Sequence, residues 1–150
     1  MNTIQVTEPS AVTQPAKLIY TAKAHTIGGR DGGTSRTSDG RLDVKFSIPG
    51  GPGFGTNPEQ LLAAGWSACF IGAIKRVAAR KKVRLPADPV IDAEVDLLNA
   101  ADGFSLRARL NVSLLGLNRE TAKAIIEDAH QTCPCSKATR GNIDLELNLV

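Results

Sequence analysis

The sequence predicts a single-domain α+β fold, and three observations support this class. Apolar and polar residues alternate along several segments, as they do in half-buried strands. Two other segments repeat their apolar residues at helical spacing and interrupt the strands. The chain has 150 residues, which is enough for one hydrophobic core. The predicted order is βββαββαβ, with antiparallel sheets around central helices.

The N-terminal part predicts a lead followed by three strands. Residues 1–17 lack an apolar stretch, so we expect a disordered lead and a single domain over residues 18–150. Leu18–Thr26 has strand character, and the string GGRDGG after it predicts a loop. Asp39-Gly40 signals a hairpin turn. A half-buried strand follows, with its apolar residues at Leu42, Val44, Phe46 and Ile48.

The first helix follows the aperiodic stretch PGGPGFGTN. Asn57 can cap it, Pro58 suits its first position, and it should run to about Arg80. Its uncharged run Leu61–Ile74 is shorter than the about 20 residues that a bilayer needs, so it predicts a buried helix rather than a membrane span. A helix on one sheet needs only an apolar stripe. The run therefore favours a homodimer that buries this helix between subunits, with burial inside one chain as the alternative.

The C-terminal part predicts a hairpin, a helix and a last strand. Residues 91–97 and 104–114 alternate with period two around the turn AADG, so they should pair. Asn118 can cap a second helix, and Pro134 should stop it. A last strand should point its apolar residues inward over residues 143–149. The expected buried stripe of the second helix is Ala122, Ile125, Ile126, Ala129 and Cys133.

Charge and cysteine content narrow the class of protein. A net charge of +3 is too small and too scattered to predict a nucleic-acid partner. The basic cluster Lys75–Arg84 suits a helix C-terminus, and an RNA or membrane role is its alternative. Three cysteines are too few for a secreted disulfide framework, so we expect a cytoplasmic protein.

Two cysteines lie in contrasting contexts. Cys69 lies inside the apolar run LLAAGWSACFIGAI, and Cys133 opens the string CPCSKATRGN. The contrast suggests a thiol pair used for chemistry, provided that the fold brings the two together. The alternative is that each is a small buried hydrophobic residue, as free cysteine usually is.

Three strings carry a resemblance to a known family. GGRDG, GTNPEQLLAAGWSACFIGA and CPCSKATRGNI, in this order and at these separations, resemble the organic hydroperoxide resistance proteins of the OsmC/Ohr family. The resemblance covers almost everything from Tyr20 to the C-terminus. It implies a thiol peroxidase built as an intertwined homodimer, with two sheets around central helices.

The resemblance also implies roles for four residues. Cys69 corresponds to the peroxidatic thiol and Cys133 to the resolving thiol. Arg30 corresponds to the cation that stabilises the thiolate, and Glu59 to the carboxylate that orients it. A free cysteine of pKa about 8.5 is only slightly ionised at neutral pH, so a nearby cation would help. For Glu59 the alternative is an ordinary acidic residue at a helix start.

The implied cycle is that of an organic hydroperoxide reductase. Cys69 would become a sulfenic acid, and Cys133 would condense with it to a disulfide, which needs Cα atoms about 4.4–6.8 Å apart. Apolar neighbours such as Trp66, Phe70 and Ile71 would favour alkyl or fatty-acid hydroperoxides, although such side chains are more often part of a core than of a pocket wall. No bound cofactor is implied. The resemblance points to a dihydrolipoyl group on a lipoylated protein as reductant.

Other readings remain open at this point. The same thiols could serve a stoichiometric redox sensor or a small-molecule binding module, and turnover separates these from an enzyme. The family usually has an aromatic residue where this chain has Cys135, which could compete for the sulfenic acid or be a bystander. His130, Cys133 and Cys135 could suggest a metal, but a structural zinc site needs four ligands. His25, the other histidine, falls on a distant predicted strand.

Overall fold

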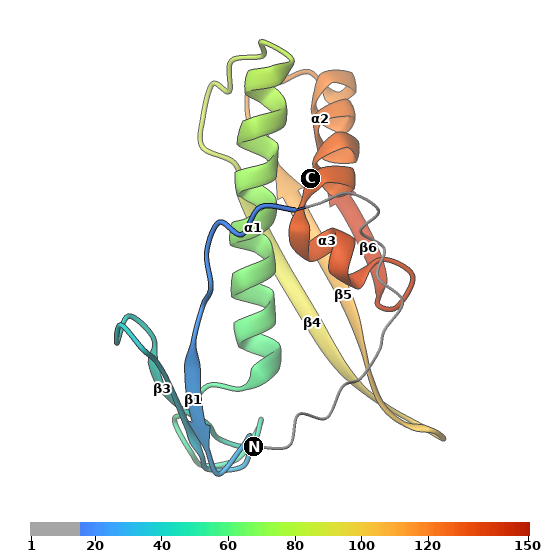
Figure 1. Cartoon of the computed structure of the whole chain (residues 1–150). Helices are drawn as coiled ribbons and strands as arrows, with labels where there is room; N and C mark the ends of the chain where they lie inside the picture. The colour runs from blue at the N-terminus through green and yellow to red at the C-terminus, as the bar shows by residue number, and fades with distance from the viewer. Residues whose placement is uncertain (1–15) are drawn as a thin grey trace.

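The computed structural model describes residues 16–150, so the expected N-terminal lead lies almost wholly outside the described residues. Two three-stranded sheets and three helices make up the described chain, which confirms the α+β class (Figure 1). The helices are α1 (Pro58–Arg80), α2 (Arg119–Thr132) and α3 (Pro134–Thr139). The strands are β1 (Ala24–Ile27), β2 (Thr34–Thr37), β3 (Asp43–Lys45), β4 (Val90–Ala100), β5 (Gly103–Ser113) and β6 (Asp144–Leu149).

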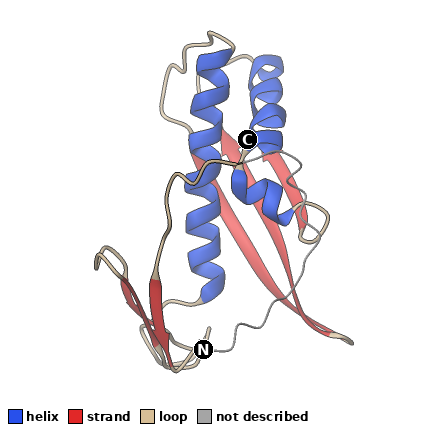
Figure 2. Cartoon of the chain, viewed as in Figure 1, coloured by secondary structure: helices blue, strands red, loops and turns tan. Residues whose placement is uncertain are grey.

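The larger sheet has the order β4-β5-β6 and carries the three helices on one face (Figure 2). β4 and β5 form the predicted antiparallel hairpin, with Val90 opposite Ser113 and Ala100 opposite Gly103. β6 departs from the expected antiparallel arrangement because it pairs with β5 in parallel. The chain between them crosses over through α2 and α3, as a parallel connection requires.

The core lies between this sheet and the helices. Its largest fully buried side chains come from α1, β5 and α2, and they include Trp66, Phe70, Ile74, Leu110 and Ile125. The predicted stripe of α2 is confirmed, because all five of its residues are buried. Cys133 belongs to this core and Cys69 packs against it, so both cysteines lie in a closely packed part of the molecule.

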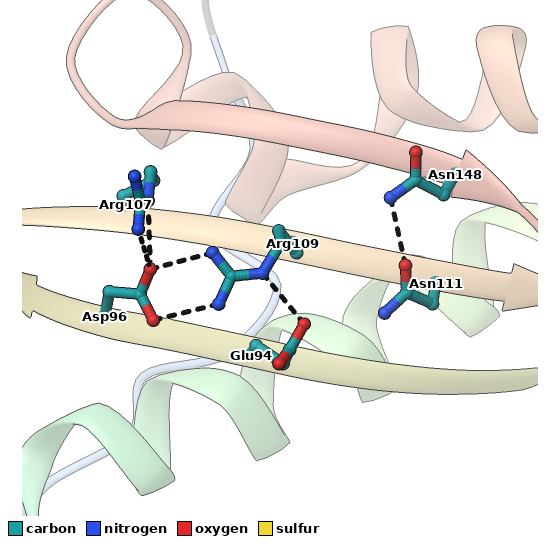
Figure 3. Close-up of polar contacts among 6 residues, drawn as sticks. All are labelled: Glu94, Asp96, Arg107, Arg109, Asn111 and Asn148. Carbon is teal, nitrogen blue, oxygen red and sulfur yellow. Dashed lines mark hydrogen bonds and ion pairs between the residues drawn. The ribbon is translucent and has the colours of Figure 1, made fainter.

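The outer face of the larger sheet carries a network of charges instead of apolar side chains (Figure 3). The carboxylate of Asp96 on β4 accepts two hydrogen bonds from Arg107 and two from Arg109, at 2.8–3.0 Å. Arg109 also donates to Glu94 at 2.8 Å. Hydrogen bonds from Arg109 and Arg107 lower the pKa of Asp96 to about 2. The network joins the two long strands on the side away from the helices.

The predicted helix starts and the predicted stop of the second helix before Pro134 are confirmed, but a third helix was not predicted. The side chain of Asn57 accepts the N–H of Gln60 at 2.9 Å, with Pro58 at the first position of α1. Asn118 caps α2 in the same way. α2 does end before Pro134, but Pro134 also opens α3, because a proline at a first helical position loses no helical hydrogen bond. Cys133 joins the two helices in an extended conformation.

The smaller sheet, β1-β2-β3, lies beyond the N-terminal end of α1 (Figure 1). The strand expected over Leu18–Thr26 begins only at Ala24, because β2 is short and its last residue, Thr37, pairs with Ala24. Of the apolar residues expected to point inward, Phe46 is buried but Ile48 is 60% exposed. Within one chain, most of this sheet has nothing packed on it.

One side of α1 is also uncovered within the chain. Ala64, Gly65 and Ala68 are exposed there, although they belong to the apolar run. By length and composition alone, α1 is the one helix among the described residues that could cross a bilayer, a test that core helices also pass. The burial of Trp66 and Phe70 in the core is what a core helix requires.

Candidate active site

The fold brings Cys69 and Cys133 together. Cys69 lies in the middle of α1, and Cys133 lies where α2 gives way to α3. The thiol of Cys133 donates a hydrogen bond to the sulfur of Cys69 across 3.5 Å, and both are free thiols. Cys133 is fully buried, whereas Cys69 is partly exposed. A disulfide bond of about 2.05 Å would need only a small closing movement.

A buried hydrogen bond holds α3 against α1 beside the thiols. The indole N–H of Trp66 donates to the hydroxyl of Ser136 at 3.2 Å, and both side chains are fully buried. Trp66 lies one helical turn before Cys69, and Ser136 lies in the first turn of α3. No role for Ser136 was predicted from the sequence. Its position in the string CPCS, next to two cysteines, was the available signal.

The surroundings of Cys69 favour its thiolate. Burial raises the pKa of the thiol, but hydrogen bonds from the backbone N–H of Cys135 and from the thiols of Cys133 and Cys135 outweigh it. The positive charge of Arg76 acts in the same direction, so the net pKa of Cys69 is lower than its ordinary value. Sequence reasoning missed Arg76. Its spacing of two helical turns from Cys69 places both on one side of α1 and could have revealed it.

Cys135 lies against the same two sulfurs but has the opposite tendency. Burial, together with the hydrogen bonds and charges of Cys69 and Cys133, raises the pKa of its thiol to about 12. Cys135 is therefore a protonated hydrogen-bond donor as long as Cys69 carries a negative charge. The aromatic ring expected at this position is replaced by a third member of the thiol cluster, which we define as Cys69, Cys133 and Cys135.

Arg30 and Glu59 form a second pair. The guanidinium of Arg30 donates two parallel hydrogen bonds, each 3.0 Å long, to the carboxylate of Glu59. Gly28, Gly29 and Gly32 all have positive φ, which lets the loop turn tightly around Arg30. The side chain of Glu59 is 12% exposed, so the pair is well shielded on that side.

The two pairs are separate within one chain. Cys69 lies about 15 Å further along α1 than Glu59, at 1.5 Å per residue. Among residues 16–150, Arg30 makes no hydrogen bond to a cysteine and Arg76 is the cation that acts on Cys69. A groove of about 310 Å³ opens beside Glu59, between the start of α1 and β4. It is lined by Pro49, Asn57, Glu59, Gln60, Ala63, Ala93, Val95 and Leu97.

His130 does not join the cysteines in a ligand set. Its Nδ1 atom is buried without a hydrogen-bond partner in the described chain. Burial and the charge of Arg140 lower the pKa of its imidazole. Within the described range, no group of three His, Cys, Asp or Glu side chains, the thiol cluster included, is arranged so as to hold a metal ion.

Comparison with known proteins gives one consistent result. The family model described as OsmC-like protein matches residues 50–148. The organic hydroperoxide resistance protein of Xanthomonas axonopodis pv. citri is 45% identical over 142 residues, which are 92% of this chain and 99% of that protein.

Solved structures agree with the sequence comparison. An organic hydroperoxide resistance protein from Legionella pneumophila superimposes with a TM-score of 0.84 at 42% identity, covering 89% of this chain and 98% of that one. The organic hydroperoxide resistance protein OhrB of Bacillus subtilis gives a TM-score of 0.82 at 40% identity, covering 87% and 98%. The chain therefore belongs to the OsmC/Ohr family and, within it, to the organic hydroperoxide resistance proteins, a group concerned with peroxide detoxification.

Proposed function

We propose that the protein is a thiol peroxidase that reduces organic hydroperoxides to alcohols. The observation that carries this proposal is the 3.5 Å approach of Cys133 to Cys69, at a place where the pKa of Cys69 is lowered. A partly exposed thiolate next to a second thiol is what a two-cysteine peroxidase requires. The similarity to organic hydroperoxide resistance proteins supports the same substrate class.

The cycle has two chemical steps. The Cys69 thiolate attacks one peroxide oxygen, the O–O bond breaks, and the leaving alkoxide takes a proton to become the alcohol. Cys69 is thereby oxidised by two electrons to a sulfenic acid. The Cys133 sulfur then attacks the Cys69 sulfur, a disulfide forms, and water leaves. A dithiol reductant returns both cysteines to thiols by exchange.

The proposed role of Arg30 requires a second copy of the chain. Its guanidinium could bind a peroxide oxygen and stabilise the developing alkoxide, with Glu59 fixing its orientation. Within one chain the pair lies too far along α1 to reach Cys69. A homodimer that covers the exposed side of α1 could bring the Arg30–Glu59 pair of one subunit to the Cys69 of the other.

The surroundings of Cys69 support the proposed substrate class, whereas the proposed reductant rests on the family resemblance. Cys69 packs against the apolar core beside Trp66 and Phe70, which favours an alkyl or fatty-acid chain over hydrogen peroxide. No bound cofactor takes part in the proposed cycle. We propose a dihydrolipoyl group of a lipoylated protein as the reductant and the cytoplasm as the location.

The test is turnover by the purified protein. Cumene hydroperoxide should be consumed over many cycles with dihydrolipoamide, and hydrogen peroxide at least tenfold more slowly. Cys69→Ser should abolish consumption, because it removes the nucleophile. Peptide mapping after one equivalent of peroxide should find Cys69 joined to Cys133 in the wild type. Consumption that stops after a single equivalent would favour the redox sensor instead.

A further inference from the structure

Cys135 is the member of the thiol cluster that the proposed cycle leaves unused. We propose that Cys135 is a second resolving thiol, which condenses with oxidised Cys69 when Cys133 does not. This inference rests on the proposed peroxidase function, because it needs Cys69 to become a sulfenic acid.

The position of Cys135 suits this role. It lies in the first turn of α3, two residues after Cys133, whose thiol is 3.5 Å from the Cys69 sulfur. Cys135 and Cys69 are both partly exposed and pack against the same core, and the backbone N–H and thiol of Cys135 contribute to the lowered pKa of Cys69. Pro134 and the bond between Trp66 and Ser136 fix the residues on either side of it. Cys135 is therefore held against the reacting sulfur by the same packing that places Cys133 there.

The charge on Cys69 affects the reactivity of Cys135. In the reduced protein, burial and the neighbouring sulfurs keep Cys135 protonated, so it donates a hydrogen bond to the Cys69 thiolate. Oxidation to the sulfenic acid removes the charge from Cys69. The contribution of Cys69 to the raised pKa of Cys135 then disappears while the contribution of burial stays, so the pKa of Cys135 falls part of the way toward its ordinary value. A larger fraction of Cys135 is therefore a nucleophilic thiolate after the oxidation of Cys69 than before it.

The resolving step balances in the same way as that of Cys133. The Cys135 sulfur attacks the Cys69 sulfur, the S–O bond breaks, and the hydroxyl leaves as water with the thiol proton. The product is a Cys69–Cys135 disulfide, which the dithiol reductant reopens. Because Cys135 is partly exposed and Cys133 is fully buried, this disulfide is more open to a reductant. A second resolving thiol also shortens the time in which Cys69 can be oxidised irreversibly to a sulfinic acid.

The experiment compares wild type, Cys133→Ser, Cys135→Ser and the double variant. Each is treated with one equivalent of cumene hydroperoxide, mapped by peptide mass spectrometry, and then assayed with dihydrolipoamide. We expect Cys133→Ser to form a Cys69–Cys135 disulfide and to turn over at least tenfold faster than the double variant. The double variant should accumulate Cys69 as sulfenic and sulfinic acid. Circular dichroism spectra and peroxide-free alkylation of Cys69 verify that each variant is folded.

The outcomes separate this inference from the proposed function. If the wild type turns over but Cys133→Ser is as inactive as the double variant and forms no Cys69–Cys135 disulfide, the inference is wrong and the function stands. If the wild type does not turn over but Cys133→Ser forms that disulfide, Cys69 is oxidised by peroxide as the inference needs, so the inference stands and only catalytic turnover, and with it the peroxidase function, fails. If peroxide leaves Cys69 unoxidised in every variant, both are overturned.

Discussion

At the scale of single residues, three thiols of one chemical type have three different environments. Cys69 is partly exposed and receives hydrogen bonds, and Cys133 is fully buried. Cys135 stays protonated because burial and the neighbouring sulfurs raise its pKa. Burial, hydrogen bonds and one cation account for the difference between Cys69 and Cys135. The cation is Arg76, which lies on the same helix as Cys69.

Replacing Arg76 tests the electrostatic part of this description. Arg76→Gln should raise the pKa of Cys69 and slow its alkylation by iodoacetamide at neutral pH about two- to threefold, because the thiolate loses a favourable charge. Rates measured from pH 5 to 9 would give the midpoint. Arg80→Gln, one turn further along the exposed end of α1, is the matched control. Equal midpoints for wild type and Arg76→Gln would contradict the assignment.

The residues of the site could be predicted only in part. The family resemblance selected Cys69 and Cys133, but the 3.5 Å between them depends on how α3 packs on α1. The pairing of Arg30 with Glu59 is present, yet its distance from Cys69 was not visible in the motifs. Ser136 was missed because a serine carries no signal until its buried partner, Trp66, is known.

At the scale of elements, the long β4-β5 hairpin is held by apolar packing on one face and by charges on the other. Asp96 is central to the charged face because both Arg107 and Arg109 bond to it. Such a carboxylate has a lower pKa in the folded protein than in the unfolded chain. Its contribution to stability is therefore fully present above about pH 4 and is lost as the pH falls toward about 2.

Asp96→Asn should make the hairpin less sensitive to acid. Urea unfolding of wild type and variant should differ most at pH 5 to 7, and the difference should shrink as the pH approaches 2. Asp92→Asn is the control, since Asp92 is an exposed residue of the same strand that forms no ion pair in the described chain. A wild-type advantage that stays constant down to pH 2 would contradict the role of Asp96.

The loop that carries Arg30 depends on Gly33. A Cβ atom at this position would collide with the backbone of Ile27 and Gly29. Gly33→Ala should therefore displace the loop, break the pair of Arg30 with Glu59, and lower the free energy of unfolding by about 1–3 kcal/mol. Urea denaturation measures the loss. Peroxidase activity should fall together with it, and an unaltered unfolding midpoint would show that the loop tolerates a side chain.

Local signals predicted the elements well and their partners less well. Asn57 and Asn118 marked the helix starts correctly, since a cap depends on neighbouring residues alone. The parallel pairing of β6 and the late start of β1 were not predicted, because both depend on which strand lies alongside. Pro134 follows the end of α2 and is also the first residue of α3. The sequence pattern predicted the helix end but not the new helix start.

At the scale of the whole molecule, two surfaces lie uncovered in one chain. They are the exposed side of α1 around Ala68 and most of the β1-β2-β3 sheet. Both lie toward the N-terminal half of α1, where the Arg30–Glu59 pair also lies (Figure 1). A homodimer that covers them would explain why the apolar run of α1 extends around the helix.

Sedimentation equilibrium should therefore find a dimer. Ala68→Arg should shift the protein to monomers and reduce peroxidase activity at least tenfold, because a long charged side chain cannot be buried between subunits. Arginine and alanine are both good helix formers, so α1 itself should persist. Ala124→Arg, at an exposed position of α2, is the control. A dimeric and active Ala68→Arg variant would place the interface elsewhere.

The sequence separation of Cys69 and Cys133 has a thermal consequence. A bond between them would close a loop spanning 64 residues and tie α1 to α3. In the chain-entropy account, such a closure restricts the unfolded chain and stabilises the folded protein by about 4 kcal/mol. Peroxide treatment should therefore raise the melting temperature by several degrees, and dihydrolipoamide should lower it again, with no shift in Cys69→Ser. Differential scanning calorimetry would then report, without any substrate assay, which fraction of the protein is in the disulfide form and has not yet been reduced.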